Sequence, residues 1–205
     1  MEALKHNFEG FEEERRLLMY EEKYGNDQTG VDSLAADLHN YICTTVRNLK
    51  NITKMHSYMI VIINNEANTI LGRFTAASAD GRRRGEPMAN ANNPAGGTDK
   101  NGITAMLNSL VKLRTDIHAG AVQNITFSKE LFNENREVLK GILKTYFKVG
   151  GQQAMINVLG KDDLLNAMKE PEKYSQLMVR VGGFSARFVT LAPDVQKEIA
   201  SRTLY

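Results

Sequence analysis

Short apolar segments alternate with amphipathic helical segments along most of this chain, and this alternation restricts the folds that it can adopt. Strand-like runs lie at residues 55–63, 122–127, 153–159 and 177–181, and residues with helical spacing lie between them. Strands that alternate with helices favour an α/β architecture. These strands are too few to close a barrel. The pattern therefore predicts one part of a larger α/β body.

Helical periodicity is clearest in two segments. The first begins at Val31 or Asp32, and its apolar stripe consists of Leu34, Leu38, Tyr41, Ile42, Val46 and Leu49. The second covers residues 129–148, where Ser128 is a candidate N-cap and a Gly-Gly pair ends the helix. Shorter helices are predicted at residues 8–20, 103–113, 162–169 and 193–201.

Composition and charge argue against several classes of function. The formal net charge of +2 is too small to favour nucleic acid or an anionic membrane as a partner. No run approaches the ~20 apolar residues of a membrane span, and the first residues lack the apolar core of a signal peptide. A single cysteine and scattered histidines give neither a disulfide framework nor the spacing of a metal site. We therefore expect a soluble, cytoplasmic protein without a metal.

Residues 77–100 are rich in Gly, Asn, Asp and Pro, which predicts a long and functional loop. Its Arg82-Arg83-Arg84 run could clamp a phosphate or a carboxylate. Because the run follows an Asp-Gly turn, we expect these side chains to be solvated or paired with acidic residues instead. His56 and His118 have no partner in the sequence, and we expect them to be structural or exposed.

The most informative motif lies near the C-terminus, in YSQLMVRVGGFSARFVTLAPDVQKEIASRT. Its Arg180-Val181-Gly182-Gly183-Phe184 resembles the signature of the pyruvate formate-lyase-like glycyl radical enzymes, in which Arg-Val and a small residue precede the radical glycine and an aromatic residue follows it. Three upstream segments resemble the same family in the same order: KYGNDQTGVDSLA, ADGRRRGEPMANANNPAGGTDKNGITAMLNSLVKL and GGQQAMINVLGKDDLLNAMKEPEKY. The resemblance implies that Gly183 is the radical site.

The resemblance also implies a fold and a division into domains. The fold is the C-terminal part of a pyruvate formate-lyase-like ten-stranded α/β barrel, incomplete in this chain. Residues 1–75 correspond to a barrel segment, and residues 76–205 correspond to the glycyl radical domain, with the radical loop near 180–188. The family more often has Ser or Ala where this chain has Gly182, and Tyr where it has Phe184. Recognition by the activating enzyme could therefore differ.

The partners and reactions are implied in the same way. The resemblance implies that the chain binds no cofactor directly. A radical S-adenosylmethionine (radical SAM) activating enzyme is implied to install the glycyl radical on Gly183 under anaerobic conditions. A homodimer is implied, with neither nucleic acid nor a membrane as a partner. The family includes lyases and transferases, among them formate acetyltransferases and dehydratases of small substrates. The residues of this chain do not name the substrate.

The chemistry requires a glycine at the radical site. A Cα radical is stabilised when the amide nitrogen and the carbonyl both delocalise it in a planar centre, which a side chain would crowd. Shielding from water and oxygen suits the apolar neighbours Val181, Phe184, Phe188 and Val189. The same residues could instead be a strand that ends in a Gly-Gly turn against a core. We expect Gly183→Ala to abolish radical formation at little cost in stability, unless Gly183 has a positive φ.

One part of the family's chemistry has no counterpart in this sequence. The glycyl radical is a store that takes a hydrogen atom from a cysteine, whose thiyl radical acts on the substrate. The family's cysteine motif is absent, and Cys43 lies mid-helix, where cysteine usually acts as a small hydrophobe. The chain could be the C-terminal part of a glycyl radical lyase, a radical-carrying accessory subunit, or an inert fragment. A free-standing chain would expose large apolar surfaces.

Overall fold

The computed structural model of the chain describes residues 1–53, 55, 57–64 and 66–205. The α-helices are α1 (Glu2–Lys5), α2 (Glu12–Tyr20), α3 (Thr29–Asn48), α4 (Ala67–Arg73), α5 (Gly102–Val111), α6 (Lys129–Glu134), α7 (Arg136–Lys148), α8 (Lys161–Lys169) and α9 (Pro193–Ser201). The strands are β1 (Val61–Ile62), β2 (Gly120–Ala121), β3 (Asn124–Ser128), β4 (Met155–Leu159), β5 (Met178–Arg180) and β6 (Ser185–Arg187). None of the helices in this described part is long and apolar enough to cross a membrane.

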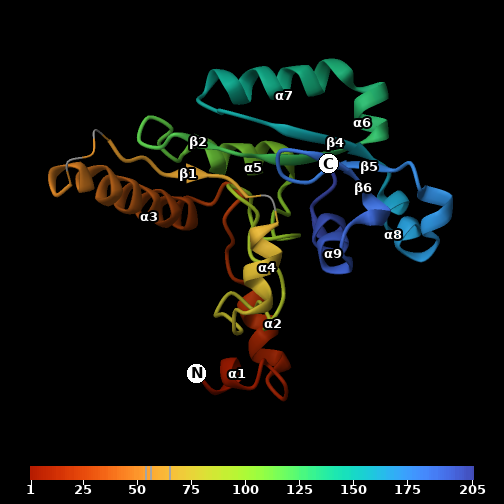
Figure 1. The fold of residues 1–205 in the computed structure, drawn as a ribbon, viewed down its shortest axis with the longest axis horizontal. Helices are drawn as coiled ribbons and strands as arrows, with labels where there is room; N and C mark the ends of the chain where they lie inside the picture. The colour runs from red at the N-terminus through yellow and green to blue at the C-terminus, as the bar shows by residue number, and fades with distance from the viewer. Residues whose placement is uncertain (54, 56, 65) are drawn as a thin grey trace.

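The elements extend in three directions from a centre near α5 (Figure 1). The helices α1, α2 and α4 form a stalk that carries the N-terminus. On one side α3 lies near β1 and β2, and on the other side α8 and α9 lie near the β5–β6 pair, with α7 above β4. The open outline fits the expected incomplete α/β barrel.

Strand pairing joins segments that are far apart in the sequence. β1 pairs in parallel with β2, and β3 pairs in parallel with β4 over their full lengths. β5 pairs with β6 in the antiparallel sense. The C-terminal tail lies along β3, because the Tyr205 amide donates to the Thr126 carbonyl at 3.0 Å and the Ser128 amide donates to the Tyr205 carbonyl at 2.6 Å. The alternation of helices and parallel strands confirms the predicted α/β class.

Two hydrophobic clusters form the core between α5 and the C-terminus. One joins α5, β3 and α7 through Met106, Leu107, Leu110, Ile125, Phe127, Leu139 and Tyr146. The other joins the end of β4 to α8, β5 and α9 through Leu159, Leu164, Ala167, Val179, Val181, Phe188, Val195 and Ile199. The second cluster therefore packs directly beneath the segment that carries the Gly-Gly pair.

Local signals in the sequence explain several element boundaries. Ser128 is the N-cap of α6, and its hydroxyl accepts a hydrogen bond from the Leu131 amide at 3.1 Å, as predicted. The single helix predicted over residues 129–148 is wrong, since Asn135 interrupts it with a φ of −121° and a ψ of 39°. The strand predicted over residues 55–63 is reduced to β1, and one residue of that range, His56, lies outside the described residues. The division at residues 75 and 76 stays a prediction.

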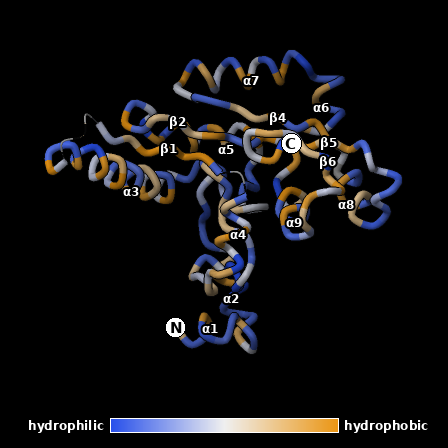
Figure 2. Tube along the Cα trace, in the orientation of Figure 1, coloured by the Kyte–Doolittle hydropathy of each residue, from blue (hydrophilic) through white to orange (hydrophobic). Residues whose placement is uncertain are grey.

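The apolar stripe of α3 is exposed, although the amphipathic pattern predicts it as a packed face. Leu34 is 70% exposed, Leu38 58% and Tyr41 71%. The buried residues of α3 are instead Asp32, His39 and Cys43. Figure 2 shows hydrophobic residues recurring along α3 at the edge of the molecule. Helical periodicity correctly identifies an apolar face, but the described part of this chain does not cover it.

Candidate functional site

The Gly182-Gly183 pair is the turn of a β-hairpin. Arg180 in β5 lies opposite Ser185 in β6, and the Val181 amide donates to the Phe184 carbonyl at 3.0 Å. Gly182 and Gly183 are therefore the two loop residues between Val181 and Phe184, and two-residue loops are the commonest connections in β-hairpins. Gly183 has a φ of +131°, a backbone conformation that residues with a Cβ rarely adopt.

The hairpin separates a buried side from an exposed side at the Gly-Gly pair. Val181 is 1% exposed and Gly182 is buried, whereas Gly183 is exposed and Phe184 is 41% exposed. Phe188 is fully buried in the cluster below. Of the apolar neighbours expected to shield the radical site, Val181 and Phe188 thus form its base and Phe184 faces outward. Among the described residues, none covers the outer side of Gly183.

Asn157 attaches the hairpin to β4. Its side-chain oxygen accepts a hydrogen bond from the Arg180 amide at 2.7 Å, and its side-chain nitrogen donates to the Arg180 carbonyl at 3.2 Å. Asn157 is 5% exposed, so both bonds form away from water. The side chain of Arg180 donates to the Ser185 hydroxyl at 3.3 Å and lies 3.9 Å from the sulfur of Met155 in β4.

A buried ion pair at the C-terminal end of α9 attaches the hairpin from a second direction. Arg202 contacts the carboxylate of Glu198 at 2.9 and 3.1 Å, and their side chains are only 10% and 9% exposed. The same guanidinium donates to the carbonyl of Val181 at 3.2 Å. Asn157 and Arg202 together thus bond the backbone of Arg180 and Val181, the two residues that directly precede the Gly-Gly turn.

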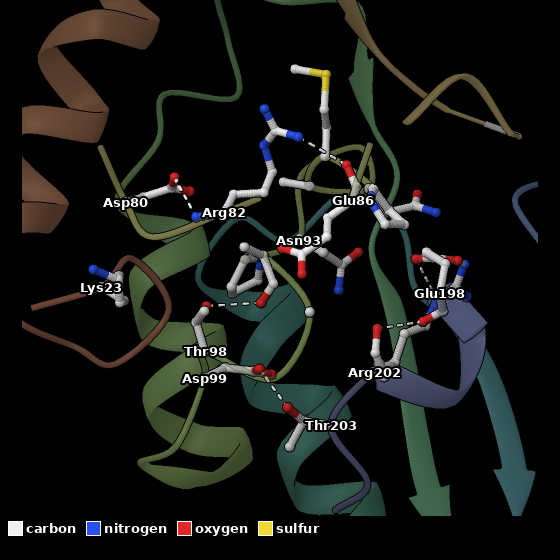
Figure 3. A pocket seen from close by; sticks show the side chains of 18 of the residues that line it. Lys23, Asp80, Arg82, Glu86, Asn93, Thr98, Asp99, Glu198, Arg202 and Thr203 are labelled. Carbon is white, nitrogen blue, oxygen red and sulfur yellow. Dashed lines mark hydrogen bonds and ion pairs between the residues drawn. The ribbon is translucent and has the colours of Figure 1, made fainter. Parts of the chain in front are cut away.

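A cleft of about 670 Å³ opens beside this ion pair. Glu198 lines it from α9, Arg202 from the position directly after α9, and Asp80 and Arg82 from the long loop (Figure 3). Asp99, also in its wall, accepts a hydrogen bond from Thr203 at 2.5 Å and another from Tyr205. Burial and the neighbouring Asp99 raise the pKa of the Tyr205 hydroxyl, which therefore stays protonated. Sequence reasoning missed this cleft because its lining comes from distant segments.

Within the arginine run, the side chain of Arg82 bonds to the backbone of the loop that contains it. Arg82 donates to the Glu86 carbonyl at 2.9 Å and to the carbonyl of Ala76. The Arg83 amide donates to the Glu86 carboxylate at 2.8 Å, and the Arg84 amide donates to the Asn7 side chain at 2.7 Å. The side chain of Arg82 is thus bonded within the loop, whereas Arg83 and Arg84 make these hydrogen bonds with their backbone amides.

Cys43 and His118 lie in a small buried cluster with His39. The rings of His39 and His118 meet edge to face with centroids 5.1 Å apart, and the Cys43 sulfur lies 3.7 Å from the His39 ring. Burial, together with His39, lowers the pKa of His118, and burial raises the pKa of the Cys43 thiol. Both groups are therefore uncharged near neutral pH. Across the described residues, no group of acidic, His or Cys side chains is arranged to hold a metal ion.

Comparisons with known proteins match almost the whole chain. The family described as "Glycine radical" matches residues 88–189, and the family described as "Pyruvate formate lyase-like" matches residues 1–72. A glycerol-bound B12-independent glycerol dehydratase from Clostridium butyricum is 32% identical, with a TM-score of 0.89 over 100% of this chain and 26% of that chain.

Two further solved structures give the same result. A structure of 1,2-propanediol dehydration in Roseburia inulinivorans is 32% identical, with a TM-score of 0.92 over 100% of this chain and 27% of that chain. A hydroxyproline dehydratase from Clostridioides difficile, bound to trans-4-hydroxy-L-proline, is 29% identical, with a TM-score of 0.92 over 99% of this chain and 26% of that chain. The chain therefore spans about a quarter of the length of these relatives.

Proposed function

The chain belongs to the glycyl radical enzyme family, with part of the family's α/β barrel and its glycyl radical domain, and we propose that Gly183 is the residue that stores the radical. The observation that carries this assignment is the hairpin turn. Gly183 is the exposed residue of the Gly-Gly pair and has a φ of +131°, whereas Gly182 is buried. A hydrogen atom can therefore pass between the Gly183 Cα and a group outside this chain.

The radical on Gly183 takes a hydrogen atom from a cysteine thiol on another part of the barrel. In this step one S–H bond breaks and one Cα–H bond forms, which leaves a thiyl radical beside the substrate and a closed-shell glycine in the loop. Cys43 is unsuited to the role, because it is 1% exposed and lies in α3, across the fold from the β5–β6 hairpin (Figure 1).

The exposed face of α3 supports a role within a larger barrel. Leu34, Leu38 and Tyr41 present a continuous apolar surface at i, i+4 and i+7. Apolar surfaces of this kind on soluble proteins usually mark interaction sites. We assign the remainder of the barrel to this face, which argues against a free-standing accessory subunit that merely carries the radical.

The reaction that we propose is dehydration of a small hydroxylated substrate. Three of the similar structures concern glycerol dehydratase, 1,2-propanediol dehydration or hydroxyproline dehydratase. Dehydration is a lyase reaction, so we favour it over the acetyl transfer of a formate acetyltransferase. A radical SAM enzyme would install the radical, and the assembly would work as an anaerobic, cytoplasmic homodimer.

Cleavage by oxygen tests the assignment of Gly183. The chain is incubated anaerobically with a radical SAM activating enzyme, S-adenosylmethionine and a reductant, and is then exposed to air. Oxygen adds to a Cα radical and breaks the backbone there, so mass spectrometry should find a C-terminal piece that begins near Phe184. Gly183→Ala should stay intact under the same treatment. Cleavage at Gly182 or elsewhere, or equal cleavage of Gly183→Ala, would refute the assignment.

A further inference from the structure

The radical hairpin is held to the rest of the fold by side chains. The ladders of the described strands join β1 with β2, β3 with β4, and β5 with β6. β4 meets β5 through two hydrogen bonds of the Asn157 side chain and a weak contact of the Arg180 guanidinium with the Met155 sulfur. An amide side chain has one acceptor oxygen and a donor nitrogen, as a peptide group has. Asn157 therefore reproduces one pair of ladder bonds to Arg180 at a single position.

Arg202 supplies the second attachment, and every nitrogen of its guanidinium is in contact with an acceptor. Nε and Nη2 bind the Glu198 carboxylate, Nη2 also binds the Val181 carbonyl at 3.2 Å, and Nη1 lies 3.5 Å from the Arg180 carbonyl. A guanidinium is suited to this task, because its donors form a rigid planar fork.

Arg202 is itself fixed in place by the residues on both sides of it. Glu198 precedes it by one turn of α9 and forms the ion pair. Thr203, directly after it, donates to Asp99, and Tyr205 is bonded to β3 through Thr126. The contact between Arg202 and the hairpin therefore connects the radical loop to the sheet and to the long loop.

We propose that Asn157 and Arg202 are positioning residues that hold the Arg180 and Val181 backbone so that Gly183 stays at a fixed place. This inference rests on the proposed function of Gly183. Transfer of a hydrogen atom requires close approach of the two reacting groups, and a displacement of about 1 Å can reduce a rate on the order of a hundredfold. Asn157 and Arg202 act through the backbone and do not themselves react.

The test uses two variants and a matched control. Asn157→Leu removes both amide bonds at similar volume, and Arg202→Lys keeps the charge beside Glu198 but loses the planar fork. Arg114→Lys is the control, because Arg114 makes a comparable two-bond pair with Asp116 on the surface.

The first measurement is amide hydrogen exchange of the chain, which needs no activating enzyme. In Asn157→Leu the Arg180 amide loses its acceptor and should exchange about fivefold faster or more, as expected for loss of a buried hydrogen bond. In Arg202→Lys the Arg180 and Val181 carbonyls lose their donor, so the hairpin should open more often and the Val181 amide, bonded to the Phe184 carbonyl, should also exchange faster than in the control. The Met155 amide, bonded to the Gln123 carbonyl at 2.7 Å, should be unchanged. Exchange at Arg180 and Val181 like that of the control would overturn the proposal, even for a chain that accepts no radical.

The second measurement is the yield of glycyl radical by electron paramagnetic resonance (EPR) after activation. Asn157→Leu and Arg202→Lys should give about fivefold less radical than the unmodified chain, and Arg114→Lys should give the same amount. Faster exchange at the hairpin with an unchanged radical yield would overturn the positioning role. If the unmodified chain gives no radical while exchange changes as expected, the attachment stands and the assignment of Gly183 fails.

Discussion

Gly183→Ala should change two properties that can be measured separately: the stability of the chain, through the backbone conformation of the hairpin turn, and the ability to form the radical. The φ of +131° at Gly183 is a conformation in which a side chain is strained, at a cost of about 1–3 kcal/mol. Loss of flexibility in the unfolded chain offsets about 0.4–1 kcal/mol of this. We therefore expect a net loss of about 1–2 kcal/mol, or about 2–8 °C in Tm for a chain of this size. The positive φ is the exception under which a cost in stability was expected from the sequence.

Gly85→Ala is the matched control for that strain. Gly85 has a φ of +81°, and a Cβ there would meet nothing within 4 Å. Thermal unfolding followed by circular dichroism should therefore show a comparable loss for both variants, while only Gly183→Ala loses the radical. A Gly183→Ala chain with the Tm of the unmodified protein would refute the backbone argument. A Gly85→Ala chain that also lost the radical would show that strain alone removes it.

Three further predictions concern stability. Gly141→Ala, in the middle of α7 with no atom within 4 Å of the new Cβ, should raise the free energy of unfolding by about 0.5–1 kcal/mol in urea titration, and a lower value would contradict the helical environment. Lys112→Ala leaves the 1%-exposed carboxylate of Asp32 without its ion pair. Denaturant unfolding should show that the free energy of unfolding falls by about 2 kcal/mol, which is less than for a fully buried pair because Lys112 itself is partly exposed. Lys129 lowers the pKa of Asp163 in the folded chain. The pair therefore contributes its full stability at pH values above the unfolded carboxyl pKa of about 3.9, and this contribution is lost as the pH falls through the lower pKa of the folded state. Lys129→Ala should reduce that acid dependence of Tm, and an unchanged acid limb would show that the pair contributes nothing.

The sequence was informative wherever a local signal determined the structure. Pro193 at the first turn predicted α9 with its observed bounds, and Ser128 predicted the start of α6. The Gly-Gly pair after an apolar segment predicted the turn that follows β5. Each of these signals acts over a few residues, so tertiary contacts did not need to be known.

Features that depend on distant partners could not be predicted in the same way. The stripe of α3 was read correctly as apolar, but periodicity does not say whether this chain or another surface covers it. β6 was missed because Ser185-Ala186-Arg187 has no apolar alternation, and its pairing with β5 follows from the turn.

The two attachments of the hairpin left weaker signals. An Asn in the middle of the apolar segment MINVL indicates a buried polar group that needs partners. Glu198 and Arg202 stand four residues apart in a helical segment, which predicts an ion pair. Neither signal shows that both side chains reach the same strand, because that contact depends on how α8, α9 and β4 pack together.

The most direct test of the central claim is EPR of the activated chain made with glycine deuterated at Cα. In the undeuterated protein, the one hydrogen left on the radical carbon should split the signal into a doublet. In the deuterated protein the doublet should collapse toward a single line, and Gly183→Ala should give no signal. A doublet that persists in Gly183→Ala, or no signal from a folded chain with an activating enzyme that works on another protein, would contradict the assignment of Gly183 as the radical site.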